Sequence, residues 1–225
     1  MNEFRWERSG RSSGENFVLK ILKRQVLVGL AFFFVCTEAL HAKVAVVLGD
    51  SLSEGYGVAK ESSYPVLLEK QLQIKDPTWK VINSSISGST SASAVGRWKW
   101  VRQQKPDLVI LALGANDGLR GLQPKEMEKN LDQVLGLISS EKDFHGKILL
   151  AGIMVPPNYG KKYSEDFRSV YPRLAKKHKV IFVPFILKDV AGHSELNLAD
   201  GIHPNEKGHR LIFETLWKSL QGELK

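Results

Sequence analysis

The pattern that most constrains this fold is an alternation, from Lys43 onward, of short apolar runs with longer stretches of helical periodicity. Five runs have the length and β-branched composition of buried strands: residues 44–48, 81–85, 108–113, 148–155 and 180–185. The helical stretches alternate with these runs: residues 64–73, 92–103, 124–140, 163–177 and about 205–220. We therefore expect a three-layer α/β/α sandwich, in which helices cover both faces of a five-stranded parallel sheet.

The first 42 residues have a different composition. Lys20, Lys23 and Arg24 precede an apolar run over residues 26–36, and small residues follow it up to Ala42. This order is typical of a secretory signal peptide. The run is too short to cross a hydrocarbon core roughly 30 Å thick as a helix, which argues against a permanent anchor. We expect an N-terminal extension and signal peptide over 1–42, cleavage near Ala42, and a single periplasmic or secreted domain over 43–225.

Composition excludes several classes of protein. A chain of 225 residues, 43% of them hydrophobic, is long enough for one domain with a sizeable core. The lone Cys36 rules out an intrachain disulfide and a thiolate zinc cluster, and the six His residues form no His-Glu-x-x-His pair. The net charge of +8 favours anionic surfaces but does not identify a reaction.

One basic and aromatic run, Arg97-Trp98-Lys99-Trp100, has the composition of a surface that binds nucleic acid or lipid. We interpret it instead as one helix whose residues alternately pack and face solvent. No nucleic-acid partner is expected.

Chemistry in an open parallel sheet belongs beyond the carboxyl ends of the strands, near the point where strand order reverses. Small and polar residues gather at these places: residues 49–53, 87–89, 114–118 and 154–159, with 200–203 before the final helix. A serine nucleophile needs a neutral imidazole, a carboxylate that orients the imidazole, and donors aimed at the oxyanion. Ser51, His203 and Asp200 are candidates for the first three parts, and Asn116 and the Gly88 N–H are candidate donors.

Other interpretations of these residues stay open. Ser51 could cap a turn, His203 could cap the last helix, and Asp50 could serve as a second acid, although a structural role in its loop is favoured. Ser53 replaces the second glycine of a Gly-x-Ser-x-Gly elbow, which disfavours an α/β-hydrolase, and Lys60 breaks a dinucleotide fingerprint. Four histidines have no evident partner and are expected to be exposed: His145, His178, His193 and His209.

Four blocks of sequence, in this order, resemble those of the GDSL or SGNH hydrolases: Gly49-Asp50-Ser51-Leu52, Gly88, Gly114-Ala115-Asn116-Asp117 and Asp200-Gly201-Ile202-His203-Pro204. Three further runs are similar to the bacterial periplasmic thioesterase I, lysophospholipase and arylesterase group: GANDGLRG (114–121), PPNYGKKY (156–163) and YPRLA (171–175). The resemblance covers nearly all of residues 43–225. It implies the flavodoxin-like SGNH fold.

The resemblance also implies roles for single residues. Ser51 would be the nucleophile, His203 the base and Asp200 its orienting partner. The oxyanion hole would consist of the Ser51 and Gly88 N–H groups and the Asn116 side-chain amide. The implied function is a serine esterase or thioesterase that acts through an acyl-enzyme on lysophospholipids, acyl thioesters or aryl esters, with no metal or cofactor.

The substrate is less constrained by the sequence. We expect Ile153, Met154, Pro156 and Tyr159 to line the acyl site, on a loop stiffened by prolines and able to bend at Gly160. The partner would be a small acyl ester or thioester, including a lysophospholipid at a membrane surface, bound by a monomer. Two alternatives are an acetyl esterase acting on glycans and a catalytically idle protein that binds acylated envelope components.

Overall fold

The computed structural model describes Met1 and residues 42–224, and the rest of the predicted signal peptide lies outside the described residues. Residues 42–224 form a five-stranded parallel sheet in the order β2-β1-β3-β4-β5. The strands are β1 (Val44–Gly49), β2 (Lys80–Asn83), β3 (Leu108–Ala112), β4 (Lys147–Ala151) and β5 (Ile181–Val183). In the middle of the sheet, Val46 of β1 is paired with Ile82 on one side and Val109 on the other.

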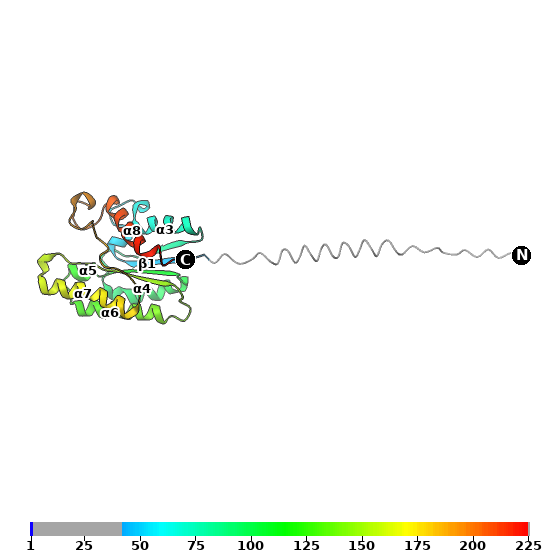
Figure 1. The fold of residues 1–225 in the computed structure, drawn as a ribbon, viewed down its shortest axis with the longest axis horizontal. Coiled ribbons are helices and arrows are strands. Elements are labelled where there is room, and N and C mark those ends of the chain that lie inside the picture. Colours follow the sequence, from blue (N-terminus) through cyan, green and yellow to red (C-terminus); the bar gives the residue numbers. More distant parts are fainter. Residues whose placement is uncertain (2–41, 225) are drawn as a thin grey trace. The chain divides into compact units, whose positions relative to one another are not determined.

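Helices cover both faces of this sheet (Figure 1). They are α2 (Ser51–Glu54), α3 (Tyr64–Lys75), α4 (Ala94–Val101), α5 (Ala115–Leu119), α6 (Pro124–Ser140), α7 (Lys161–His178) and α8 (Glu206–Leu220). The α3 and α8 helices pack together on one face, while α4, α6 and α7 pack in a row on the other. The predicted three-layer sandwich is therefore confirmed.

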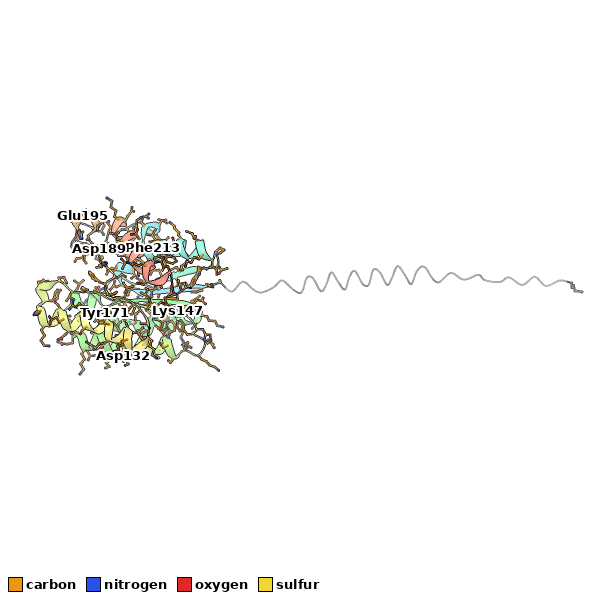
Figure 2. All side chains as sticks on the ribbon, viewed as in Figure 1. Asp132, Lys147, Tyr171, Asp189, Glu195 and Phe213 are labelled. Carbon is orange, nitrogen blue, oxygen red and sulfur yellow. The ribbon has the colours of Figure 1, made fainter. Side chains whose placement is uncertain are left out.

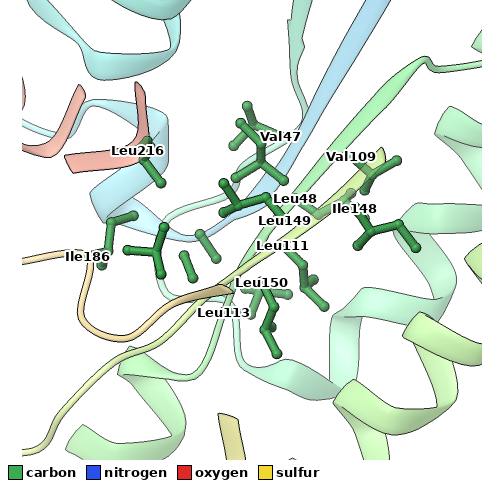
Figure 3. Packing of buried hydrophobic residues seen from close by; sticks show 14 of the residues in the cluster. Val47, Leu48, Val109, Leu111, Leu113, Ile148, Leu149, Leu150, Ile186 and Leu216 are labelled. Carbon is green, nitrogen blue, oxygen red and sulfur yellow. The ribbon is translucent and has the colours of Figure 1, made fainter. Parts of the chain in front are cut away.

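The core lies where these helices meet the central strands (Figure 3). Every residue of β1 and β3 is buried, which explains why these strands are continuous apolar runs and not alternating patterns. Val47, Leu111 and Leu149 are fully buried, and each such side chain stabilises the fold by about 1.5 to 3 kcal/mol. The sheet is thus a rigid base for the loops at its carboxyl edge.

Some strands end at other residues than predicted, and two short helices were not predicted at all. The fourth run ends as a strand at Ala151, not at residue 155, and the fifth ends at Val183. Pro184 has no N–H to donate, and the two segments are joined beyond these ends only by the bonds of Gly152 to Val183, at 2.8 Å, and to Ile186, at 2.9 Å. The short helices α2 and α5 were not predicted, because helices of this length carry no periodic signal.

The order of the strands reverses at β1. The chain passes from β1 to β2 on one side and then returns to β3 on the other side of β1. Ligands of open parallel sheets bind at such a switch point, outside the carboxyl ends of the strands. Within residues 42–224, no helix is long and apolar enough to span a membrane.

Candidate active site

Ser51 is the first residue of α2, directly after the carboxyl end of β1. Asp50 caps this helix: its Oδ1 accepts a hydrogen bond of 3.1 Å from the backbone N–H of Leu52. The cap fixes the turn between strand and helix, and the Ser51 side chain is left half-buried at the switch-point edge.

A chain of hydrogen bonds joins Ser51 to the start of the last helix. The Ser51 Oγ lies 3.0 Å from Nε2 of His203, and Nδ1 of the same ring lies 2.7 Å from Oδ2 of Asp200. Both are hydrogen-bond distances, and a hydroxyl, an imidazole and a carboxylate in this order can pass a proton from the hydroxyl to the ring. The sequence prediction placed the three residues together, and the structure does the same.

Asp200 is held by its own turn as well as by the imidazole. Its Oδ1 accepts bonds from the backbone N–H groups of His203, at 3.0 Å, and Ile202, at 2.9 Å. The backbone N–H of His203, then its ring, then the N–H of Ile202 lower the Asp200 pKa to about 2. Asp200 is therefore ionised throughout the neutral range and fixes the tautomer of His203 with Nδ1 protonated.

The His203 ring is also covered by an aromatic side chain that the sequence analysis did not identify. The Tyr56 ring centroid lies 4.5 Å from that of His203, with the planes tilted by 42°. Tyr56 follows α2 by two residues, and about half of its surface is exposed. No local sequence pattern predicts this contact, because Tyr56 and His203 are 147 positions apart in the sequence.

Gly88 lies in a β-turn over residues 86–89, closed by a 3.1 Å bond from Ser89 N–H to the Ile86 carbonyl. Gly88 has a φ of +76°, whereas Ser87 is not among the residues with positive φ. This combination defines a type II turn, whose third residue favours glycine. An added Cβ would find open space apart from Arg120, 3.8 Å away, so the backbone conformation, not crowding, selects glycine here.

Asn116 lies in α5, the short helix that follows β3. In the sheet, β3 is paired with β1. The preceding Gly114 has a φ of +125°, and a Cβ there would lie 2.1 Å from the hydroxyl of Tyr171. Tyr171 of α7, which is labelled in Figure 2, donates to the Leu113 carbonyl at 3.1 Å. Next in the chain, the buried Asp117 accepts bonds from the N–H and Oγ of Ser91. Asn116 is thus presented by a tightly packed turn.

A second carboxyl group, that of Asp50, is fully buried and precedes Ser51 in the chain. Burial raises its pKa to about 6, while the bond from Leu52, the charge of Arg97 and the nearby Asn116 amide lower it in part. Its Oδ2 has no hydrogen-bond partner within residues 42–224. Arg97 is itself buried and donates to the Gly49 and Ser84 carbonyls at 2.7 Å.

The four residues expected at the acyl site are in different surroundings. Ile153 is buried in the hydrophobic core, whereas Met154 and Pro156 are exposed on the loop that follows β4. Tyr159 is half-buried and donates its hydroxyl proton to the Leu119 carbonyl at 2.9 Å. The loop after β4 is thereby linked to α5, the helix that contains Asn116.

The expectation that His209 is exposed is wrong. Its side chain is 1% exposed, and its Nδ1 accepts a 3.3 Å bond from the backbone N–H of Tyr64. The hydroxyl of Tyr64 donates in turn to Ser53 at 2.7 Å. His178 is also partly buried, with Nε2 at 2.7 Å from Asp132. Neither burial could be read from the chain, because both depend on neighbouring helices.

The interpretation of the run from Arg97 to Trp100 as one helix holds: Arg97 and Trp98 are buried in α4, while Lys99 and Trp100 are exposed. Among the side chains of residues 42–224, no group of three or more His, Cys, Asp or Glu is arranged to hold a metal ion.

Sequence comparisons place the chain among known esterases. Residues 47–211 match the GDSL-like Lipase/Acylhydrolase family. The chain is 41% identical over 200 residues to an arylesterase of Vibrio mimicus, an alignment that covers 88% of this chain and 98% of that protein. It is 38% identical over 196 residues to "Thioesterase 1/protease 1/lysophospholipase L1" of Escherichia coli, covering 85% of this chain and 91% of that protein.

The fold comparison agrees. The crystal structure of TesA matches with a TM-score of 0.76 and 38% identity, over 81% of this chain and all of that one. The esterase AlinE4, described as an SGNH-hydrolase, matches with a TM-score of 0.66 and 37% identity, over 82% of this chain and 97% of that one. The chain belongs to the GDSL-like lipase/acylhydrolase family and is an ester-cleaving hydrolase.

Proposed function

We propose that Ser51, His203 and Asp200 form the catalytic triad of a serine esterase and thioesterase. The observation that carries this proposal is the hydrogen-bonded series from Asp200 through His203 to the Ser51 Oγ, at 2.7 and 3.0 Å. A carboxylate that fixes the tautomer leaves Nε2 free to accept the Ser51 proton. The whole triad comes from one chain, which supports action as a monomer.

The reaction follows from this geometry in two steps. Ser51 Oγ attacks the acyl carbonyl while its proton passes to His203, which then protonates the departing alcohol or thiol. In the second step His203 takes a proton from water, and the resulting hydroxide adds to the acyl carbonyl. The bond from the acyl carbon to Ser51 Oγ then breaks, His203 returns its proton to Oγ, and the acid departs. Both steps pass through a tetrahedral oxyanion.

The oxyanion hole in this proposal has three donors from the ends of three strands. They are the Ser51 N–H after β1, the Gly88 N–H after β2 and the Asn116 amide after β3. Because these strands are parallel neighbours, their carboxyl ends meet at one edge. Preorganised donors of this kind usually supply the largest share of rate acceleration in acyl transfer.

The substrate in this proposal has an apolar acyl chain. Large hydrophobic side chains are exposed on the loops at this edge: Tyr56, Ile86, Leu119, Leu122, Met154 and Ile202. An apolar rim around a nucleophile favours an acyl group over the sugar of a glycan ester. Met154, Pro156 and Tyr159 stay in the proposed acyl site, whereas the buried Ile153 supports the loop from below.

The same rim supports a finer proposal, that the enzyme takes lysophospholipids from a membrane surface. Exposed apolar side chains on several loops can enter the interface, and the net charge of residues 43–225, which is +6 from 26 basic and 20 acidic residues, favours anionic lipids. We place the activity outside the cytoplasm because of the predicted signal peptide. Sequencing the N-terminus of the exported protein would test that location and the cleavage near Ala42.

The experiment that tests the function is hydrolysis of nitrophenyl esters of graded acyl length, and of an acyl thioester, by wild-type and Ser51→Ala protein starting at Lys43. We expect activity that rises beyond the two-carbon ester and is abolished in folded Ser51→Ala. Activity that survives without Ser51 would overturn the triad. A preference for the acetyl ester would favour the glycan esterase, and no turnover of any ester would favour the idle binder.

A further inference from the structure

The turn that carries Gly88 is exposed and is hydrogen-bonded to side chains from two short helices of the site. One of them, α2, begins with Ser51, and the other, α5, contains Asn116. A β-turn on the surface has few packing contacts that would hold its central peptide in one orientation. Its orientation matters here, because the Gly88 N–H belongs to that central peptide.

Glu54 ties the turn to α2. Its carboxylate accepts a 2.9 Å hydrogen bond from the backbone N–H of Ser87 and a second bond from the Ser87 hydroxyl. Glu54 is one helical turn after Ser51, so the same short helix carries the nucleophile and this carboxylate. The peptide on the N-terminal side of the central one is thus held by α2.

Arg120 ties the turn to α5 from the other side. Its Nη2 donates a 2.9 Å hydrogen bond to the Gly88 carbonyl, which belongs to the peptide after the central one. Arg120 caps the C-terminus of α5, four residues after Asn116. The two peptides that flank the Gly88 N–H are therefore each held by a charged side chain from a different helix.

We propose that Glu54 and Arg120 are positioning residues that fix the Gly88 N–H relative to the Ser51 N–H and the Asn116 amide. The inference rests on the proposed oxyanion hole. Each helix that supplies one donor also sends a side chain to the turn that supplies the third. In a type I turn the same peptide would be rotated by about half a turn and would aim its carbonyl where its N–H now points.

This role has a specific kinetic signature. An oxyanion donor contributes when the tetrahedral oxygen forms, so a loosened turn should lower kcat and leave KM nearly unchanged. Loss of a whole donor costs about 100-fold to 1000-fold in kcat. A donor that remains but is less well oriented should cost less, on the order of tenfold.

The test measures kcat and KM on the best nitrophenyl ester for Glu54→Ala, Glu54→Gln and Arg120→Ala, each checked for folding by thermal unfolding. We expect Glu54→Ala and Arg120→Ala to lower kcat about tenfold, with KM within about twofold of wild type. Glu54→Gln keeps an acceptor oxygen for the Ser87 N–H, so it should stay within about threefold of wild type. Should Glu54→Ala not fold, Arg120→Ala still decides the outcome.

Glu61→Ala and Lys125→Ala are matched controls for the loss of one charge, because neither side chain has a hydrogen bond or ion pair within residues 42–224. A kcat for Glu54→Ala and Arg120→Ala no lower than for these controls would overturn the inference. So would a Glu54→Gln variant as slow as Glu54→Ala, since charge and not position would then matter. Ser51→Ala and Asn116→Ala in parallel separate this failure from failure of the proposed function.

Discussion

His203 and His209 are six residues apart near the end of the chain, yet their surroundings differ completely. His203 is bonded to the Asp200 carboxylate and the Ser51 hydroxyl, and its side chain is 20% exposed. His209 is buried, has no carboxylate partner within residues 42–224, and accepts a bond from the Tyr64 N–H. Burial, and to a lesser extent the charge of His203, lower its pKa to about 4.

His203 and His209 show how one residue type can serve two purposes in the same fold. An imidazole beside an ionised carboxylate can take up a proton and keep it while a bond breaks. An imidazole in an apolar layer stays neutral, because the charged form would lose its hydration. His203 is thus suited to proton transfer, and His209 is suited to holding α3 on α8.

The largest expected effect concerns His203, the histidine that is bonded to Ser51. His203→Gln should lower kcat/KM on the order of 10⁵-fold, because the variant lacks the imidazole that accepts the Ser51 proton. The melting temperature should stay close to that of wild type, since the side chain is partly exposed. Ester kinetics and thermal unfolding measure the two quantities. A His203→Gln variant that keeps more than about 1% of wild-type kcat/KM would contradict the role of His203 as the base.

Asp200→Asn should have the second largest effect, on the order of 10³-fold to 10⁴-fold in kcat. The amide can keep the turn bonds to Ile202 and His203, but it allows the ring tautomer that cannot accept the Ser51 proton. Single-turnover kinetics with a nitrophenyl ester would measure the acylation step directly. Near-normal acylation in this folded variant would show that the carboxylate of Asp200 is not needed.

The pH dependence of the unfolding free energy tests the environment of the buried histidine, His209. The unfolded chain protonates His209 near pH 6.5, and the folded chain only near pH 4. The unfolded state therefore binds more protons within this window, and His209 costs stability as the pH falls from 6.5 to 4. The unfolding free energy of wild type relative to His209→Leu should fall by on the order of 3 kcal/mol between pH 7 and pH 4.

Urea unfolding of both proteins at a series of pH values measures this change. A constant difference between pH 7 and pH 4 would mean that His209 is not held neutral in the folded state.

The smallest expected effect is the cost of His209→Leu at pH 7. Leucine fills the space but leaves the Tyr64 N–H without an acceptor, so the unfolding free energy should fall by about 1 to 3 kcal/mol. Activity should stay within about threefold of wild type, because His209 does not touch Ser51. His209→Gln offers an acceptor oxygen and serves as the matched control. A stability loss equal in both variants would count against the role of this hydrogen bond.

The fold was predictable from the chain because strand and helix periods are local. The helix over residues 124–140 has exactly the predicted bounds, where Pro124 marks its start and an apolar stripe marks its buried face. The contact between Asp200 and His203 was equally predictable, since these two residues are three positions apart in one turn. Glu54 and Tyr56 were missed, since their partners Ser87 and His203 come from distant parts of the sequence.

By itself the sequence determined the alternation of strands and helices, the edge at which polar loops gather, and the residue types able to perform acyl transfer. Those features depend on near neighbours in the chain. Only the tertiary structure decided that His209 is buried, that Asp50 has a raised pKa, and that Glu54 and Arg120 meet on the turn of Gly88. Burial and proton affinity depend on which distant segments exclude water from a group, and no local pattern encodes that packing.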